Sequence, residues 1–224
     1  MYKVLVSFLA VSTVLFSACN SDKKLVELEW NVYRSAIEHG DISTSVNSLN
    51  RIIAIEKYNA DALDTLALLY LSAGSNDAAA KIATRALNVR ESDELVLALG
   101  KAYKGLGKHD LSLENFSKLL VKRPEDLELL YEVSYAKINL GKLREALPEI
   151  QMIIAHPESE KTVMQEFIKE GSQMVPYKAV ALNMLGFLQN QAGQSADAMA
   201  SYQAALGIFP NYYLASNNLK ILAT

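Results

Sequence analysis

Cys19 carries the only thiol of the 224-residue chain, and the three imidazoles belong to His39, His109 and His156. A single cysteine cannot form an intramolecular disulfide, and we do not expect a thiolate metal site around it. The histidines lie far apart in the sequence, and none occurs in an HExxH motif. We therefore predict no catalytic residues, no metal site and no cofactor, and we predict that the protein is not an enzyme.

The residues before Cys19 have the layout of a secretory signal. Lys3 is followed by an apolar run over residues 4–16 and then by two small residues. This run is short for a membrane span, and its order of charge, apolar stretch and small residues is typical of a signal peptide. An ordinary signal peptide with a chance cysteine is the alternative to the interpretation that follows.

The segment Phe16-Ser17-Ala18-Cys19 resembles the lipobox of bacterial lipoprotein precursors, although leucine is more usual than phenylalanine at its first position. The resemblance implies a signal peptide over residues 1–18, lipidation of Cys19 and a polar tether over residues 19–25. The next residue is Asn20, whereas an aspartate there would resemble the inner-membrane retention signal. We therefore expect lipid anchoring at the bacterial outer membrane, facing the periplasm, with cell-surface exposure as an alternative. The inner membrane is the alternative location.

The composition excludes some other functions. Lys and Arg number 22 against 25 Asp and Glu, which gives a formal net charge of −3. No basic cluster stands out, so nucleic acid is not an expected partner. The glycines do not form the GxxxxGK[ST] loop that binds phosphates, and no small-molecule substrate is expected.

Glycines recur at a nearly constant interval. Gly40, Gly74, Gly107, Gly141 and Gly193 are separated by 34, 33, 34 and 52 residues. A fixed period of this length is the signature of a repeat architecture, in which each unit buries its apolar face against its neighbours.

The stretch from Ala179 to Pro210 identifies the repeat. Small and large residues alternate in the order that the tetratricopeptide repeat (TPR), a 34-residue helix-turn-helix, requires. They are Leu185, Gly186, Gly193, Ala198, Tyr202 and Ala205, followed by Pro210. The chain resembles TPR proteins over about residues 26–210. The resemblance implies an all-α, right-handed α-solenoid of about five TPR helix pairs with a C-terminal capping helix.

The predicted TPR domain spans residues 26–224. Its repeats lie near residues 26–59, 60–92, 93–126, 127–157 and 179–212, and the cap helix covers 213–224. The longer last interval between glycines leaves an insertion at 158–178. Val163, Phe167 and Ile168 share one face of a helical wheel, so we predict one extra helix there.

In TPR proteins the first helices of successive repeats line a groove, and the resemblance implies a partner-binding site on those helices. Aromatic side chains supply contact area and amides can bind an extended backbone, although these aromatics could instead pack between helices. The predicted partner-binding groove residues are Lys101, Lys104, Tyr131, Tyr135, Asn139, Asn183, Phe187 and Asn190. The expected partner is a protein or peptide segment.

A lipid-anchored chain of five repeats is similar to the small outer-membrane TPR lipoproteins that help to assemble pili or secretion machines, including those of tight-adherence (Flp) and type IV pili. The expected function is therefore a periplasmic scaffold for such an assembly. An adaptor lipoprotein that recruits cell-wall enzymes is the second interpretation. A periplasmic enzyme with an unrecognised site is the third.

Overall fold

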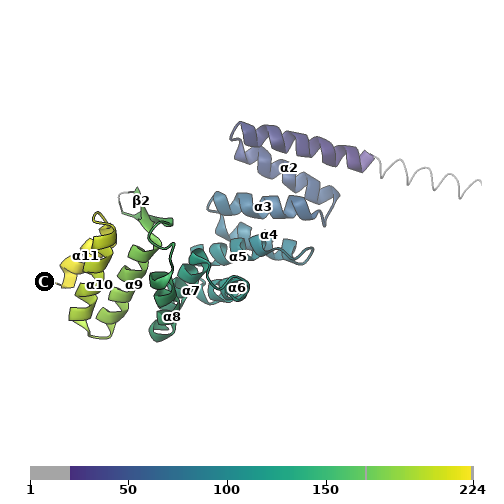
Figure 1. The fold of residues 1–224 in the computed structure, drawn as a ribbon. Coiled ribbons are helices and arrows are strands. Elements are labelled where there is room, and N and C mark those ends of the chain that lie inside the picture. Colours follow the sequence, from purple (N-terminus) through teal and green to yellow (C-terminus); the bar gives the residue numbers. More distant parts are fainter. Residues whose placement is uncertain (1–20, 170, 223–224) are drawn as a thin grey trace, which may run out of the picture. The chain divides into compact units, whose positions relative to one another are not determined.

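The computed structural model describes residues 21–169 and 171–222, which are mostly helical (Figure 1). Residues 21–38 are helical. The following helices are α2 (Ile42–Ile55), α3 (Ala60–Ser72), α4 (Asn76–Leu87), α5 (Asp93–Gly105), α6 (His109–Lys122), α7 (Leu127–Asn139), α8 (Leu143–Ala155), α9 (Tyr177–Gln191), α10 (Ser195–Ile208) and α11 (Tyr213–Leu222). The predicted fold of antiparallel helix pairs is confirmed. Two strands, β1 (Val163–Ile168) and β2 (Gly171–Pro176), separate α8 from α9.

The five recurring glycines lie between the two helices of each pair. All five have φ between 69° and 75°, a left-handed conformation that glycine adopts without a steric penalty. After Gly74, the amide of Ser75 donates to the carbonyl of Tyr70 at 2.9 Å, and equivalent bonds follow Gly40, Gly141 and Gly193. This is the hydrogen bond of a Schellman motif, which ends a helix and reverses the chain.

The chain divides into two compact units, the first ending at Leu106 and the second beginning at Gly107. The division falls inside the third predicted repeat, so α5 belongs to the first unit and α6 to the second. Within each unit, the first helices of neighbouring pairs are in contact. Helix α3 contacts α5 in the first unit, and α7 contacts α9 in the second.

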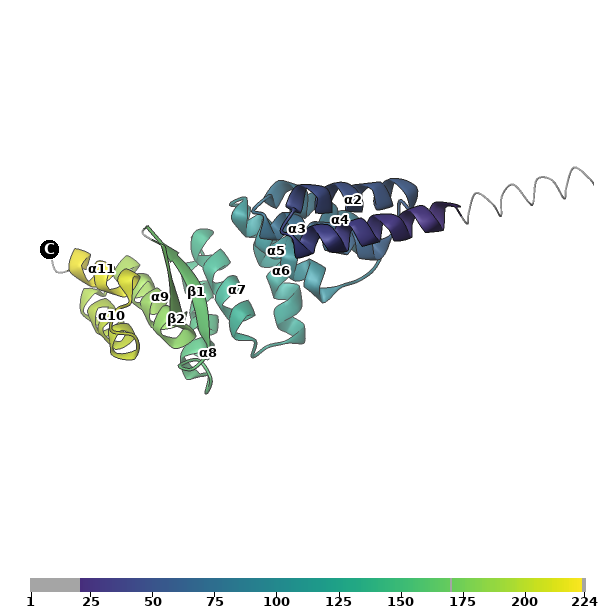
Figure 2. The same ribbon diagram turned by 90° about the horizontal axis from the view of Figure 1, so that it is seen from above.

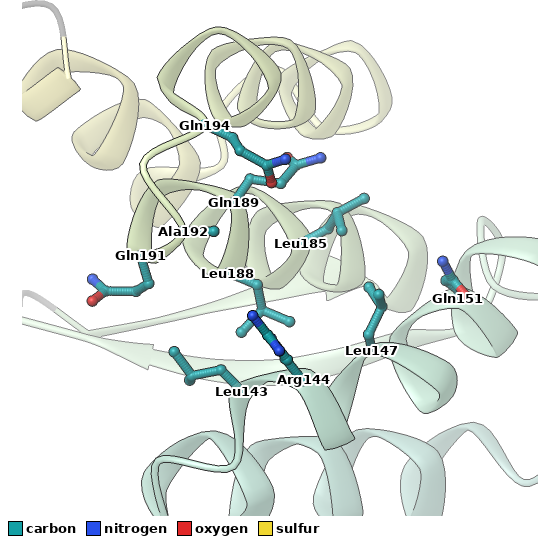
Figure 3. Close-up of a pocket in the computed structure, with 10 residues that line it drawn as sticks. All are labelled: Leu143, Arg144, Leu147, Gln151, Leu185, Leu188, Gln189, Gln191, Ala192 and Gln194. Atoms are coloured by element: carbon teal, nitrogen blue, oxygen red, sulfur yellow. The ribbon is translucent and has the colours of Figure 1, made fainter.

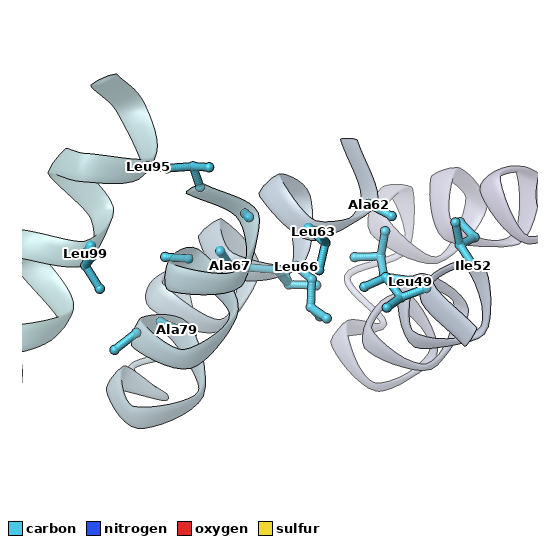
Figure 4. Close-up of a cluster of buried hydrophobic side chains, with 14 of the residues drawn as sticks. Leu49, Ile52, Ala62, Leu63, Leu66, Ala67, Ala79, Leu95 and Leu99 are labelled. Atoms are coloured by element: carbon cyan, nitrogen blue, oxygen red, sulfur yellow. The ribbon is translucent and has the colours of Figure 1, made fainter. Parts of the chain in front are cut away.

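The first unit is held together by leucines and isoleucines that pack between closely spaced helices (Figure 4). Ala67, Ala79 and Ala86, at the positions where the repeat requires small residues, are each at most 1% exposed. Leu63 and Leu66 of α3 are fully buried among them. Small residues at the crossing points let the helices approach, and the leucines fill the space between neighbouring pairs.

The second unit uses the same device where α9 crosses α10. Gly186 of α9 lies against the ring of Tyr202 on α10, and a Cβ atom built on Gly186 would lie 2.6 Å from Tyr202 Cε1. Tyr202 is 1% exposed, and Ala198 and Ala205 beside it are fully buried. Only glycine therefore fits at position 186 without displacing a buried ring.

The prediction of a helix in the insertion was wrong. Residues 163–168 and 171–176 form the two strands of an antiparallel hairpin, in which Met164 pairs with Val175 and Glu166 pairs with Gln173. Helix α9 also begins at Tyr177, within the range assigned to the insertion. The hairpin lies alongside α9 in Figure 2.

The alternation of exposure along β1 explains the error. Val163, Gln165 and Phe167 are exposed, whereas Met164, Glu166 and Ile168 are partly buried. The exposed set includes the polar Gln165 and the partly buried set includes the polar Glu166. Hydrophobicity therefore does not alternate along the sequence, although burial does. The period of two that marks a half-buried strand was therefore hidden.

Candidate partner-binding surface

The predicted groove residues are divided between the two units. Lys101 and Lys104 lie on α5 in the first unit. The other six lie on two helices of the second unit that contact each other, α7 and α9. They are Tyr131, Tyr135 and Asn139 on α7, and Asn183, Phe187 and Asn190 on α9. The structure therefore brings six of the eight residues onto one pair of helices.

The hairpin and the C-terminal helix cover one end of this surface. Tyr131 and Asn183 are each only 8% exposed. Val175 and the partly buried Met164 pack in the same apolar cluster as Tyr131. The ring of Tyr177, at the start of α9, lies 6.3 Å from that of Tyr131 in an edge-to-face arrangement. Tyr131 and Asn183 are consequently part of the core.

Hydrogen bonds fasten the hairpin to the start of α11. The Gln173 amide donates from Nε2 to the carbonyl of Asn211 at 2.7 Å, and its Oε1 accepts from the backbone N–H of Tyr213 at 3.0 Å. On α11, Asn218 donates from Nδ2 to Asn183 Oδ1 at 2.9 Å. These bonds link the hairpin to the start of α11, and α11 to α9.

Two polar groups meet in the core beneath the hairpin. The hydroxyl of Tyr212 and Oε2 of Glu166 are both buried, and neither has a hydrogen-bond partner among the described residues. Burial raises the pKa of Tyr212, and the carboxylate of Glu166 raises it further. Burial also raises the pKa of Glu166, although the nearby Tyr212 hydroxyl opposes the rise. The carboxylate is thus held where its charged form is disfavoured.

Substituting Glu166 is expected to make stability less dependent on pH. Because the folded state raises the pKa of Glu166 above 4.5, the folded chain holds this proton more tightly than the unfolded chain. Folding is therefore favoured at low pH, and this contribution is lost as pH rises from the unfolded pKa through the folded one. Glu166→Gln should raise the free energy of unfolding by about 1 kcal/mol at pH 7 and by much less near pH 4.

Urea denaturation of Glu166→Gln at the two pH values measures the effect. Glu125→Gln, which changes an exposed carboxyl in the same unit, serves as the control and should leave stability nearly unchanged. A loss of stability in Glu166→Gln at pH 7 would mean that the folded state stabilises the charged carboxylate, which would contradict the raised pKa of Glu166.

The other end of the α7 and α9 surface remains accessible. Tyr135, Phe187 and Asn190 are partly exposed, and Asn139 is exposed. Asn139 donates from Nδ2 to the backbone carbonyl of Tyr135 at 2.8 Å, which fixes the orientation of the amide. The Tyr135 ring also lies 5.9 Å from Tyr131 and 6.1 Å from His109. We call Tyr135, Asn139, Phe187 and Asn190 the open face.

The described residues contain neither a cluster of metal ligands nor a membrane-spanning helix. Within the ranges 21–169 and 171–222, no three His, Cys, Asp or Glu side chains lie together as a metal site would need. None of the helices in these ranges combines the length and the apolar character needed to cross a bilayer. Cys19, the predicted lipidation site, lies outside the described residues.

The helix pairs, the turn glycines and the small residues at the crossings define an all-α fold of the TPR type. Residues 179–212 match the family model for the tetratricopeptide repeat. The matched range coincides with the fifth predicted repeat. No curated protein sequence matches the chain.

Solved structures share this fold at low sequence identity. YrrB, described as a TPR protein with an unusual peptide-binding site, is 16% identical with a TM-score of 0.72, and the match covers 92% of this chain and 97% of YrrB. MamA from Desulfovibrio magneticus RS-1 is 13% identical with a TM-score of 0.68, covering 84% of this chain and 97% of MamA. A tetratricopeptide repeat protein from Parabacteroides merdae is 18% identical with a TM-score of 0.51, covering 89% and 71%.

Proposed function

We propose that this protein is a scaffold that binds a segment of a protein partner on the open face of α7 and α9. The observation that carries the proposal is the combination of partly exposed aromatic rings and amides on two helices whose other end is covered by the hairpin. Rigid aromatic side chains give contact area at a low entropic cost, and amides can pair with an extended backbone. YrrB, which has a similar fold, is described as having a peptide-binding site.

The finer parts of the proposal come from the sequence. Cys19, in its lipobox-like segment, would anchor the scaffold to the bacterial outer membrane on the periplasmic side. The partner would then be a component of a pilus or secretion machine. An adaptor that recruits cell-wall enzymes would use the same anchor and the same open face, and the identity of the captured partner separates the two.

A photo-crosslinking amino acid at position 187, in cells that express the lipoprotein, tests the open face. We expect a discrete crosslinked partner in washed membranes, and we expect Tyr135→Ala with Asn190→Ala to reduce its yield about tenfold, the loss typical of truncated anchor residues. The same crosslinker at the exposed position 203 on α10 is the control. In a Cys19→Ser chain, the protein should move to the soluble fraction.

Two results would contradict the proposal. Equal crosslinking from positions 187 and 203 would show that the open face is not the contact surface. Retention of Cys19→Ser in salt-washed membranes would contradict the proposed lipid anchor but not the assignment of the open face.

A further inference from the structure

A concave surface lies between α8 and α9, within the second unit (Figure 3). It encloses a cavity of about 710 Å³, a volume within the range of ligand sites in proteins. Its apolar lining consists of Leu143, Leu147, Leu185 and Leu188, with Ala192 at the edge. None of the predicted groove residues lines it. This cavity is therefore separate from the open face.

The remaining lining residues are polar, and one of them is charged. Arg144 carries the only charge in the lining, and the others are Gln151, Gln189, Gln191 and Gln194. Gln189 accepts a hydrogen bond from Ser201 Oγ at 2.6 Å. The side chains of Arg144, Gln151, Gln191 and Gln194 have no hydrogen-bond or ion-pair partner elsewhere in the described part of the chain.

This arrangement specifies a ligand by its chemistry. The leucines can cover a large apolar side chain, and the guanidinium of Arg144 can pair with a carboxylate through two parallel hydrogen bonds. The amides offer both donors and acceptors, as the backbone of an extended peptide requires. A hydrocarbon chain would leave those amides unpaired, so a lipid fits less well than a peptide.

We propose that the cavity between α8 and α9 binds an extended peptide segment in which a leucine-like side chain and an acidic side chain are two residues apart. That spacing places both side chains on the same face of an extended strand. The apolar side chain occupies the surface of Leu147, Leu185 and Leu188, and the carboxylate pairs with Arg144. This site is independent of the partner surface proposed above.

The probe is the acetylated and amidated peptide Ser-Gly-Leu-Ser-Glu-Ser-Gly, titrated into the full chain in detergent with its leucine methyl groups labelled for NMR. We expect the methyl signals of Leu147, Leu185 and Leu188 to shift, with a dissociation constant on the order of 1 mM. Replacing the glutamate of the peptide by glutamine, or introducing Arg144→Gln, should weaken binding about tenfold.

Two matched variants isolate the site. Lys142→Gln removes an exposed cation beside the cavity that does not line it, and should leave binding unchanged. Phe187→Ala alters the open face and should also leave it unchanged, so the outcome does not depend on the proposed function. The inference is overturned by an absence of shifts, by equal binding of the glutamine peptide, or by unchanged binding to Arg144→Gln. It is also overturned if decanoate, but not the peptide, shifts these signals.

Discussion

Replacing Val175 by aspartate is expected to destabilise the second unit by about 3 kcal/mol or more, or to release the hairpin from the helices. Val175 is fully buried and packs in the cluster that contains Tyr131. An aspartate at that position would place a charge among apolar and aromatic side chains. The change can be measured by urea denaturation, and release of the hairpin by the rate of tryptic cleavage after Lys161 and Lys169.

The neighbouring residue of the same strand provides the control. Met174 is 55% exposed, because successive side chains of a strand point to opposite sides. Met174→Asp should therefore change stability by less than about 0.5 kcal/mol. If Met174→Asp costs more free energy than Val175→Asp, the pairing of β1 and β2 described above is wrong, since a shift by one residue would exchange the two faces.

Gly186→Ala is the second substitution with a large expected effect. The new methyl group would lie 2.6 Å from Tyr202 Cε1 and 3.1 Å from the carbonyl oxygen of Ala198, so the buried ring or the backbone must move. Overpacking of this kind costs about 1–3 kcal/mol. Alanine also favours the helix by up to about 1 kcal/mol, which offsets part of the loss.

Gly207→Ala on α10 separates these two contributions. Nothing lies within 4 Å of a Cβ atom at that position, so only the gain in helix propensity should appear. Because the gain in helix propensity is common to both variants, we expect their free energies of unfolding to differ by the overpacking cost alone, about 1–3 kcal/mol. An equal effect of both substitutions would show that α9 and α10 do not cross at Gly186.

The helical part of the fold could be predicted because its constraints are local. A left-handed turn at Gly74 or Gly193 depends on a few neighbouring residues, and the need for a small residue at Gly186 follows from one helix crossing. These requirements recur in every repeat, so the same residue types appear at equivalent positions several times along the sequence. The register of Gly186, Ala198 and Tyr202 within the fifth repeat agrees with the packing that the structure shows.

The insertion occurs once, so no repetition helped to interpret it. Its inward face includes Glu166 and its outward face includes Phe167, which reverses the usual relation between polarity and burial. The burial of Tyr131 and Asn183 follows from the position of the hairpin, and the sequence did not reveal that position. The same limit applies to the cavity at Arg144, which depends on the distance between two helices.

The hydrogen bonds of Gln173 have a thermodynamic consequence. In a linear array each repeat touches only its neighbours, so the last repeat can unfold alone and the end of the array frays. Here one hairpin packs with Tyr131 of the fourth repeat and is also bonded to Asn211 and Tyr213 at the start of the terminal helix. The last two repeats and the cap should therefore melt in a single cooperative step, which gives this end of the chain the all-or-none unfolding of a small globular domain.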